Sequence, residues 1–149
     1  MNDSERKIPL HQPRGLLETV VYTENLDAAR CFYEEVLGLE LVSAEEGRHL
    51  FFRVGTSMLL VFDGRQTSKA TVLVNNQTIP RHGASGPSHF AFSVNHDQIE
   101  PIRKHLQKHQ VAIESEIAWP GGGHSLYCRD PDGNSVEFAT QNLWFGPSA

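Results

Sequence analysis

Three polar residues stand out because each interrupts a stretch that otherwise reads as a buried β-strand. Glu18 lies in L-L-E-T-V-V-Y-T, His89 in S-H-F-A-F-S-V and Glu137 in N-S-V-E-F-A-T. Side chains alternate along a strand, so each of the three lies on the face opposite to the one that holds a set of apolar residues: Val21, Phe90, Phe92, Val136 and Phe138. If they converge, the two carboxylates repel each other unless a cation holds them. Such a set of oxygen and nitrogen ligands predicts one divalent metal per site, chosen among Mn, Fe, Ni, Zn and Mg.

The strands that carry these residues belong to two halves with the same order of elements. Each half reads as a strand, a helix and three further strands, over residues 16–62 and 88–141. In the first half the predicted strands are 16–23, 39–44, 49–54 and 57–62, around a helix at 26–37. In the second half they are 88–94, 111–117, 125–129 and 134–140, around a helix at 97–109. Residues 1–15 read as a flexible arm, 63–87 as a linker and 142–149 as a tail, all within one structural domain.

The two halves align on their own residues, which indicates an internal duplication. The first strand of each half matches with an offset of 71, which places Glu18 on His89. If two extra turn residues are allowed in the second half, Arg53 matches Arg129 and Leu59 matches Glu137. Polar residues that interrupt apolar strands therefore fall at equivalent positions, which unrelated surface charges would not do.

The overall composition favours one globular domain and excludes several classes of function. The chain has 149 residues, 39% of them hydrophobic, and a formal net charge of −5. That charge, with no run of Lys or Arg, argues against nucleic-acid binding. The polar N-terminus contains no apolar run, so we expect no membrane span and a cytoplasmic location. Cys31 and Cys128 are too few for a disulfide framework and lack metal-ligand spacing.

Three motifs resemble the vicinal oxygen chelate superfamily of glyoxalases, bleomycin-resistance proteins and extradiol dioxygenases. They are N-L-D-A-A-R-C-F-Y-E-E-V-L-G-L at 25–39, S-H-F-A-F-S-V at 88–94 and L-Y-C-R-D-P-D-G-N-S-V-E-F at 126–138. The resemblance implies an α+β fold in which two paired βαβββ modules form a curled mixed sheet around a cavity, in a homodimer. It also implies metal ligands at four positions, which here hold Glu18, Leu59, His89 and Glu137. Because leucine cannot bind a metal, three ligands remain, as in the dioxygenase-like and fosfomycin-type members.

The same resemblance extends the site beyond the metal ligands. Ser125 and Tyr127 match an S-x-Y pair that faces the ligand in fosfomycin-type proteins, so Tyr127 is expected either to bind a substrate oxygen or to line the cavity. Glu18 is either a ligand or a general base beside the metal. No arginine follows Gln141, which argues against fosfomycin resistance.

Four further residues complete the predicted substrate-binding set. His49 and His124 lie near the site in the alignment of the two halves, either as extra ligands or proton carriers or as histidines with no special role. Phe51 matches Tyr127 in that alignment, and Trp119 is expected to flank the mouth of the cavity.

Two functions agree with these residues. The first is a metal-dependent enzyme, a lyase or isomerase or a dioxygenase, which chelates neighbouring oxygens of a small-molecule substrate. The second is a metal-free protein that sequesters a small molecule, as bleomycin-resistance proteins do. The matched polar residues favour the enzyme, because a protein that only binds has no need of them.

Overall fold

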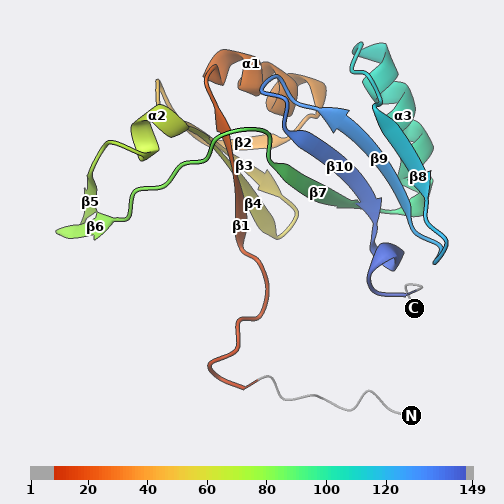
Figure 1. Ribbon diagram of the computed structural model, residues 1–149, viewed down its shortest axis with the longest axis horizontal. Coiled ribbons are helices and arrows are strands. Elements are labelled where there is room, and N and C mark those ends of the chain that lie inside the picture. Colours follow the sequence, from red (N-terminus) through yellow and green to blue (C-terminus); the bar gives the residue numbers. More distant parts are fainter. Residues whose placement is uncertain (1–8, 147–149) are drawn as a thin grey trace.

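The computed structural model describes residues 9–146 and places them in two four-stranded mixed sheets with helices packed against them (Figure 1). The predicted α+β fold with two paired βαβββ units is therefore confirmed. Residues 1–8 of the predicted arm and 147–149 of the predicted tail lie outside the described part of the chain.

The first unit forms a sheet in the order β1-β4-β3-β2, in which β1 runs parallel to β4. Its elements are β1 Glu18–Thr23, α1 Leu26–Arg30, a π-helical turn Cys31–Val36, β2 Glu40–Glu45, β3 His49–Val54 and β4 Ser57–Asp63. The Asn25 side chain caps α1 by accepting a hydrogen bond from the backbone N–H of Ala28, at 3.0 Å. The structure differs from the prediction in two places. The strand begins at Glu18 rather than Leu16, and the single predicted helix 26–37 becomes π-helical in its second half.

The second unit repeats this arrangement in the order β7-β10-β9-β8, with β10 parallel to β7. Its elements are β7 His89–Val94, a 3-10 turn His96–Gln98, α3 Ile99–Lys108, β8 Ser115–Ala118, β9 His124–Arg129, β10 Ser135–Thr140 and a 3-10 turn Gln141–Leu143. The predicted strand 111–117 is shorter than expected. Its first residue instead closes the end of α3, because the backbone N–H of Val111 donates to the carbonyl of Leu106 at 2.9 Å.

The segment between the units contains a short helix, α2 Gly64–Thr67, and a separate hairpin of β5 Val72–Val74 and β6 Gln77–Ile79. These two strands pair only with each other. Asn75 and Asn76 turn the hairpin with positive φ angles of 48° and 62°, a conformation that asparagine tolerates better than most residues. The sequence predicts only a linker here, and β6 was not predicted.

The core lies between the sheets and the helices, and it is crossed by one buried polar contact. Tyr33, which is fully buried in the π-helical turn, donates from its hydroxyl to Oδ2 of Asp130 at 2.7 Å. Burial and the neighbouring carboxylate both raise the pKa of Tyr33, so the phenol stays protonated. This bond ties the first unit to the turn between β9 and β10.

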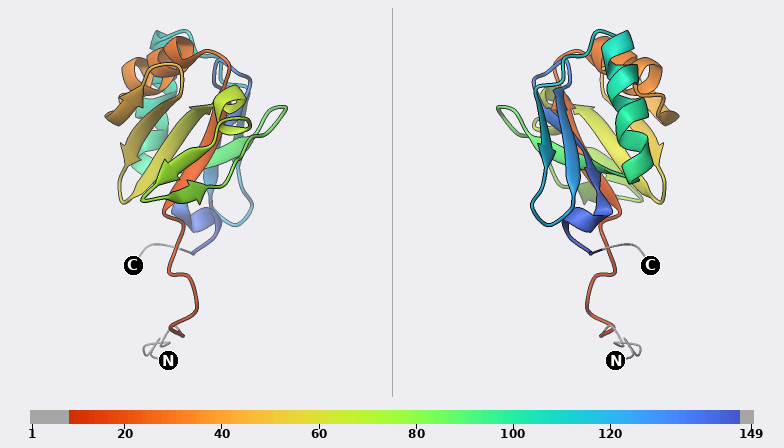
Figure 2. Two further views of the ribbon diagram at one scale, coloured as in Figure 1. Left: turned by 90° about the vertical axis from the view of Figure 1, so that its left-hand side faces the viewer. Right: turned by 90° about the vertical axis from the view of Figure 1, so that its right-hand side faces the viewer.

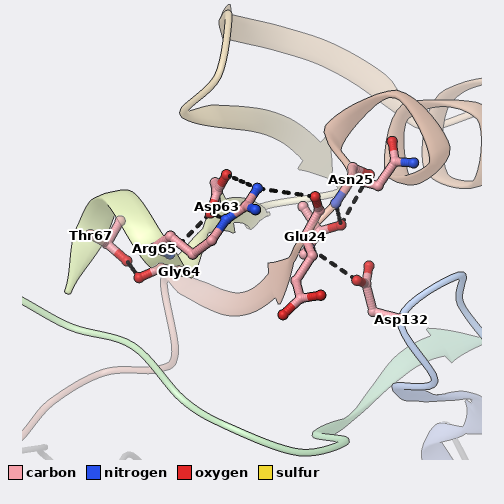
Figure 3. A network of polar contacts seen from close by, with 8 residues as sticks. Glu24, Asn25, Asp63, Gly64, Arg65, Thr67 and Asp132 are labelled. Atoms are coloured by element: carbon pink, nitrogen blue, oxygen red, sulfur yellow. Dashed lines mark hydrogen bonds and ion pairs between the residues drawn. The ribbon is translucent and has the colours of Figure 1, made fainter. Parts of the chain in front are cut away.

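A second polar network joins the two units near the surface (Figure 3). The backbone N–H of Glu24 donates to Asp132 Oδ1 at 3.0 Å. Arg65 donates to the Glu24 carbonyl at 3.2 Å and also pairs with Asp63 at 2.7 Å. These bonds fix the end of β1 against α2 and against the β9–β10 turn.

Each sheet is covered by helices on one face only, which the two side views show (Figure 2). On β7 the alternation is regular: Phe90 and Phe92 are buried under the helices, whereas His89, Ala91 and Ser93 are exposed on the opposite face. We call this second face the open face of each sheet. The predicted polar residues lie there.

The strand register corrects the predicted alignment of the two halves by one residue. Arg53 lies opposite Met58, and Arg129 lies opposite Ser135, so the second turn is only one residue longer than the first. Glu137, two residues after Ser135, is therefore equivalent to Leu60 rather than Leu59. Leucine occupies the position in either alignment, so the first unit still offers no ligand there.

Candidate functional site

The centre of the candidate site is a pair formed by His89 on β7 and Glu137 on β10. Nε2 of His89 lies 3.1 Å from Oε2 of Glu137. On the other side of the ring, Nδ1 lies 3.0 Å from the carbonyl oxygen of Ser135. The Ser135 hydroxyl lies 3.2 Å from the same nitrogen, so Nδ1 can either donate to the carbonyl or accept from the hydroxyl, and Nε2 correspondingly either presents a lone pair to the carboxylate or donates to it. The His89–Glu137 contact is therefore made either by a ring proton on Nε2 or by a metal ion held between the two residues.

The Glu137 carboxylate has one further oxygen that the chain leaves without a partner. Glu137 is 5% exposed, and its Oε1 is buried with no hydrogen-bond partner among residues 9–146. An ionised oxygen in this position costs several kcal/mol unless a cation or a donor satisfies it, by the usual order of magnitude. A divalent metal fits this requirement. His89 and Glu137 would hold such an ion, which would supply the positive charge that the unpartnered oxygen lacks.

Tyr127 borders the same pair from the neighbouring strand. It lies directly opposite Glu137 in the β9–β10 ladder, and its ring stacks against His89 with 6.2 Å between ring centroids. Burial raises the pKa of Tyr127, and the Glu137 carboxylate raises it further. The hydroxyl is therefore kept protonated at neutral pH and serves as a hydrogen-bond donor.

Glu18, the third predicted ligand, is placed apart from the pair. It begins β1, opposite Met58, and its side chain is exposed on the other sheet. In the described range 9–146, no group of three His, Cys, Asp or Glu side chains is arranged to hold a metal ion. One chain thus supplies two of the three predicted ligands at one place and the remaining carboxylate at another.

Three of the remaining predicted residues already have partners inside the second unit. Trp119 donates from Nε1 to Oγ of Ser125, which is fully buried, at 2.9 Å. His124 contacts Glu116 through Nε2 at 2.8 Å, and Arg103 binds the same carboxylate. Ser125 and Trp119 therefore support β9 behind Tyr127, whereas His124 belongs to a charged cluster with Glu116.

His49 and Phe51 lie on the open face of the first sheet, within a group of aromatic rings. The two rings stack with centroids 3.9 Å apart, and Phe62 meets Phe51 edge to face at 5.2 Å. His82, from the segment between the units, extends the group by contacting Phe62 and by bonding to the Tyr22 hydroxyl at 2.6 Å. Burial lowers the pKa of His49, so its ring is neutral at pH 7.

Two contributors to these faces were missed by sequence reasoning. Ser135 holds Nδ1 of His89 through its carbonyl, and its hydroxyl lies 3.2 Å from the same nitrogen. Strand parity could have found it, since Ser135 lies two residues before Glu137. Phe62 carried no such signal, because an apolar residue in an apolar strand gives no hint of which face it occupies.

The chain also contains a cavity of about 650 Å³ that is separate from this site. It lies between the end of β1, α2 and the β9–β10 turn, and its lining includes Tyr22, Arg65, Lys69 and Asp132. None of the predicted site residues lines it. The unpartnered carboxylate oxygen of Glu137 lies at the pair with His89 and not in the lining of this cavity.

Among the helices of the described residues, none is both long and apolar enough to cross a membrane.

Comparisons with known proteins agree with this geometry. The chain is similar to the structure of a lactoylglutathione lyase from Agrobacterium tumefaciens, with 40% identity, a TM-score of 0.82, and coverage of 89% of this chain and 98% of that one. An integron cassette protein from the mobile metagenome of the Halifax Harbour sewage outfall is 26% identical, with a TM-score of 0.67 and coverage of 86% and 99%. A glyoxalase/bleomycin resistance protein/dioxygenase from Nocardioides shares the fold at 17% identity, with a TM-score of 0.67 and coverage of 93% and 90%. No curated protein matches the chain.

A family model covers nearly the whole of the two units. It matches residues 15–138, a range that includes Glu18, His89 and Glu137. The chain belongs to the Glyoxalase/Bleomycin resistance protein/Dioxygenase superfamily.

Proposed function

We propose that the chain is a metal-dependent enzyme that chelates two neighbouring oxygens of a small-molecule substrate. One observation carries the proposal: His89 Nε2 lies 3.1 Å from a buried Glu137 carboxylate whose second oxygen has no hydrogen-bond partner among residues 9–146. A plain ion pair would satisfy only Oε2. A metal ion would satisfy both residues, and it would supply Lewis-acid stabilisation of the negative charge that develops on substrate oxygens.

The residues of the chain then have separate roles. His89 and Glu137 would hold the metal, and the Ser135 carbonyl would accept a hydrogen bond from Nδ1 in the tautomer that presents Nε2 to the metal. The protonated hydroxyl of Tyr127, beside the pair, donates a hydrogen bond to a substrate oxygen and orients the substrate. The Agrobacterium relative is described as a lactoylglutathione lyase, and it supports a lyase as the reaction class.

The third ligand comes from a second copy of the chain in our proposal. Glu18 lies on the open face of one sheet, while His89 and Glu137 lie on the open face of the other. In a twofold dimer, the open face of the first sheet of each chain can meet the open face of the second sheet of the other chain. This contact occurs twice by symmetry, which gives two equivalent sites. Each site would combine Glu18 of one chain with His89 and Glu137 of the other.

Elemental analysis of untagged protein, purified without chelators, tests the metal. We expect close to one divalent ion per chain, lost in His89→Ala and in Glu137→Ala. Ser93→Ala is the matched control, because Ser93 is exposed on the same face of the same strand and should leave the metal content unchanged. A metal-free wild type that also gains no stability from added divalent ions would refute the enzyme and favour sequestration of a small molecule without metal.

Mixing two defective variants tests whether the site is shared. Glu18→Ala and His89→Ala are unfolded together and refolded, so that half of the dimers are mixed. Each mixed dimer then has one intact site, and the mixture recovers about one quarter of the wild-type metal content. If all three ligands came from one chain, no intact site could form in any dimer, and the mixture would recover none.

A further inference from the structure

The β5–β6 hairpin is an arm that stands away from the body of the protein. In Figure 2 (left) the hairpin lies in front of the β1-β4-β3-β2 sheet, and α1 and α3 lie behind that sheet. The arm thus projects from the open face of this sheet, which is the face that carries Glu18. Its two strands bond to no third strand, and a two-stranded hairpin alone is marginally stable in water.

One face of the arm is apolar and uncovered. Val72 pairs with Ile79, and Val74 pairs with Gln77, so Val72, Val74 and Ile79 share a face. Val74 is 54% exposed and Ile79 is 41% exposed. Leu73 lies on the other face of the hairpin, opposite Thr78. An apolar strand face of this kind is expected to be covered by another surface.

The charge of the segment points to the surface that covers it. Residues 64–87 contain three basic residues, Arg65, Lys69 and Arg81, and no acidic one. The rest of the chain has ten basic and eighteen acidic residues, a net charge of −8. The hairpin itself has no charged residue and Arg65 is paired with Asp63, so Lys69 and Arg81 make the base of the arm a basic segment of an acidic protein. A second copy of the same chain therefore offers it a surface of complementary charge.

We propose that the β5–β6 arm packs against a second copy of the chain and stabilises the dimer beside the shared site. The proposal rests on the proposed function in one respect, because the divided ligand set is the reason why a partner must approach this face. The apolar face of Val72, Val74 and Ile79 would pack on the partner, and Arg81 at its base would meet acidic groups there. The arm would then contribute to dimer affinity without touching the metal.

The oligomeric state of the full chain tests the proposal. Sedimentation velocity over a concentration series should show a dimer for the wild type. The double variant Val74→Glu/Ile79→Glu should raise the dimer dissociation constant at least about tenfold. The matched control is Thr78→Glu, which places a carboxylate on the other face of the same hairpin and should change it less than about twofold. Circular dichroism checks that each variant is folded.

A second variant keeps the test decisive if the double variant does not fold. Arg81→Glu leaves the apolar face intact and should weaken the dimer, with an effect that shrinks as salt is added. A monomeric wild type, or unchanged dimerisation in both Val74→Glu/Ile79→Glu and Arg81→Glu, would overturn the proposal. Metal content measured in the same samples distinguishes the proposed role of the arm from the proposed metal site. If the arm variants still form dimers and still bind metal, the role of the arm is refuted and the metal site is not.

Discussion

Removing the Tyr33 hydroxyl tests how strongly one buried bond holds the two units together. Tyr33→Phe deletes the 2.7 Å bond to Asp130 and keeps the ring in its packing. The ring contacts Phe32, Phe52 and Phe90, with centroids 4.9, 5.9 and 6.4 Å away. A hydrogen bond to a charged acceptor contributes about 1.5–3 kcal/mol. Asp130 keeps its bonds to Asn134 and to the backbone of Asp132, so we expect the lower part of this range.

Urea unfolding at pH 7 measures this cost. With an m-value of about 2 kcal/mol per molar, a loss of about 2 kcal/mol lowers the midpoint by about 1 M. Tyr22→Phe is the control, because the Tyr22 hydroxyl also makes a short bond, to His82, but in a partly buried place. It should lower the midpoint by less than about half as much. Equal midpoints for wild type and Tyr33→Phe would refute the view that this bond couples the two units.

Three other properties follow from single residues. Burial lowers the pKa of His49 below that of an exposed histidine. The contribution of His49 to stability is therefore present above about pH 6.5 and is lost as the pH falls through the lowered pKa. His49→Gln should make the urea midpoint fall less between pH 7.5 and pH 5. A Cβ added at Gly123 would lie 2.8 Å from the backbone of the 3-10 turn that follows β10. Gly123→Ala should therefore lower the free energy of unfolding by about 1–3 kcal/mol in the same assay. Gly121 has open space around it, so Gly121→Ala should lower it by less than about 0.5 kcal/mol. Burial raises the pKa of the Cys128 thiol to about 11, so a thiol reagent should label only the exposed Cys31 in the folded protein and both cysteines after denaturation; labelling of Cys128 in the native state would contradict this.

The fold could be predicted from the sequence because its strands alternate clearly and its turns carry recognisable residues. The pattern at 88–94 places Phe90 and Phe92 on one face and His89 on the other, as the structure has them. The π-helical turn could not be predicted in this way. A π-helix and an α-helix bury the same kinds of side chain, so the apolar pattern over residues 26–37 does not distinguish them.

The β5–β6 hairpin and the register of the repeat were hidden for a different reason. Polar residues surround the hairpin, so its three-residue strands give too short a pattern to identify. The turn lengths in the two units differ by one residue, and that difference decides whether Leu59 or Leu60 matches Glu137. Only the pairing of strands resolves it, because one residue of slip exchanges the two faces of a strand.

The separation of Glu18 from the pair follows from how the two units have diverged. The second unit has His89 and Glu137 on its open face, where the first has Glu18 and Leu60. A single unit therefore cannot complete a three-ligand site, whereas the open face of a first unit and the open face of a second unit together can. The first face also carries the aromatic group around His49, so a site built from both faces has a polar wall that holds the charge and an apolar wall that holds the rest of a substrate. Because each chain has one face of each kind, the twofold dimer that we propose would contain two such sites.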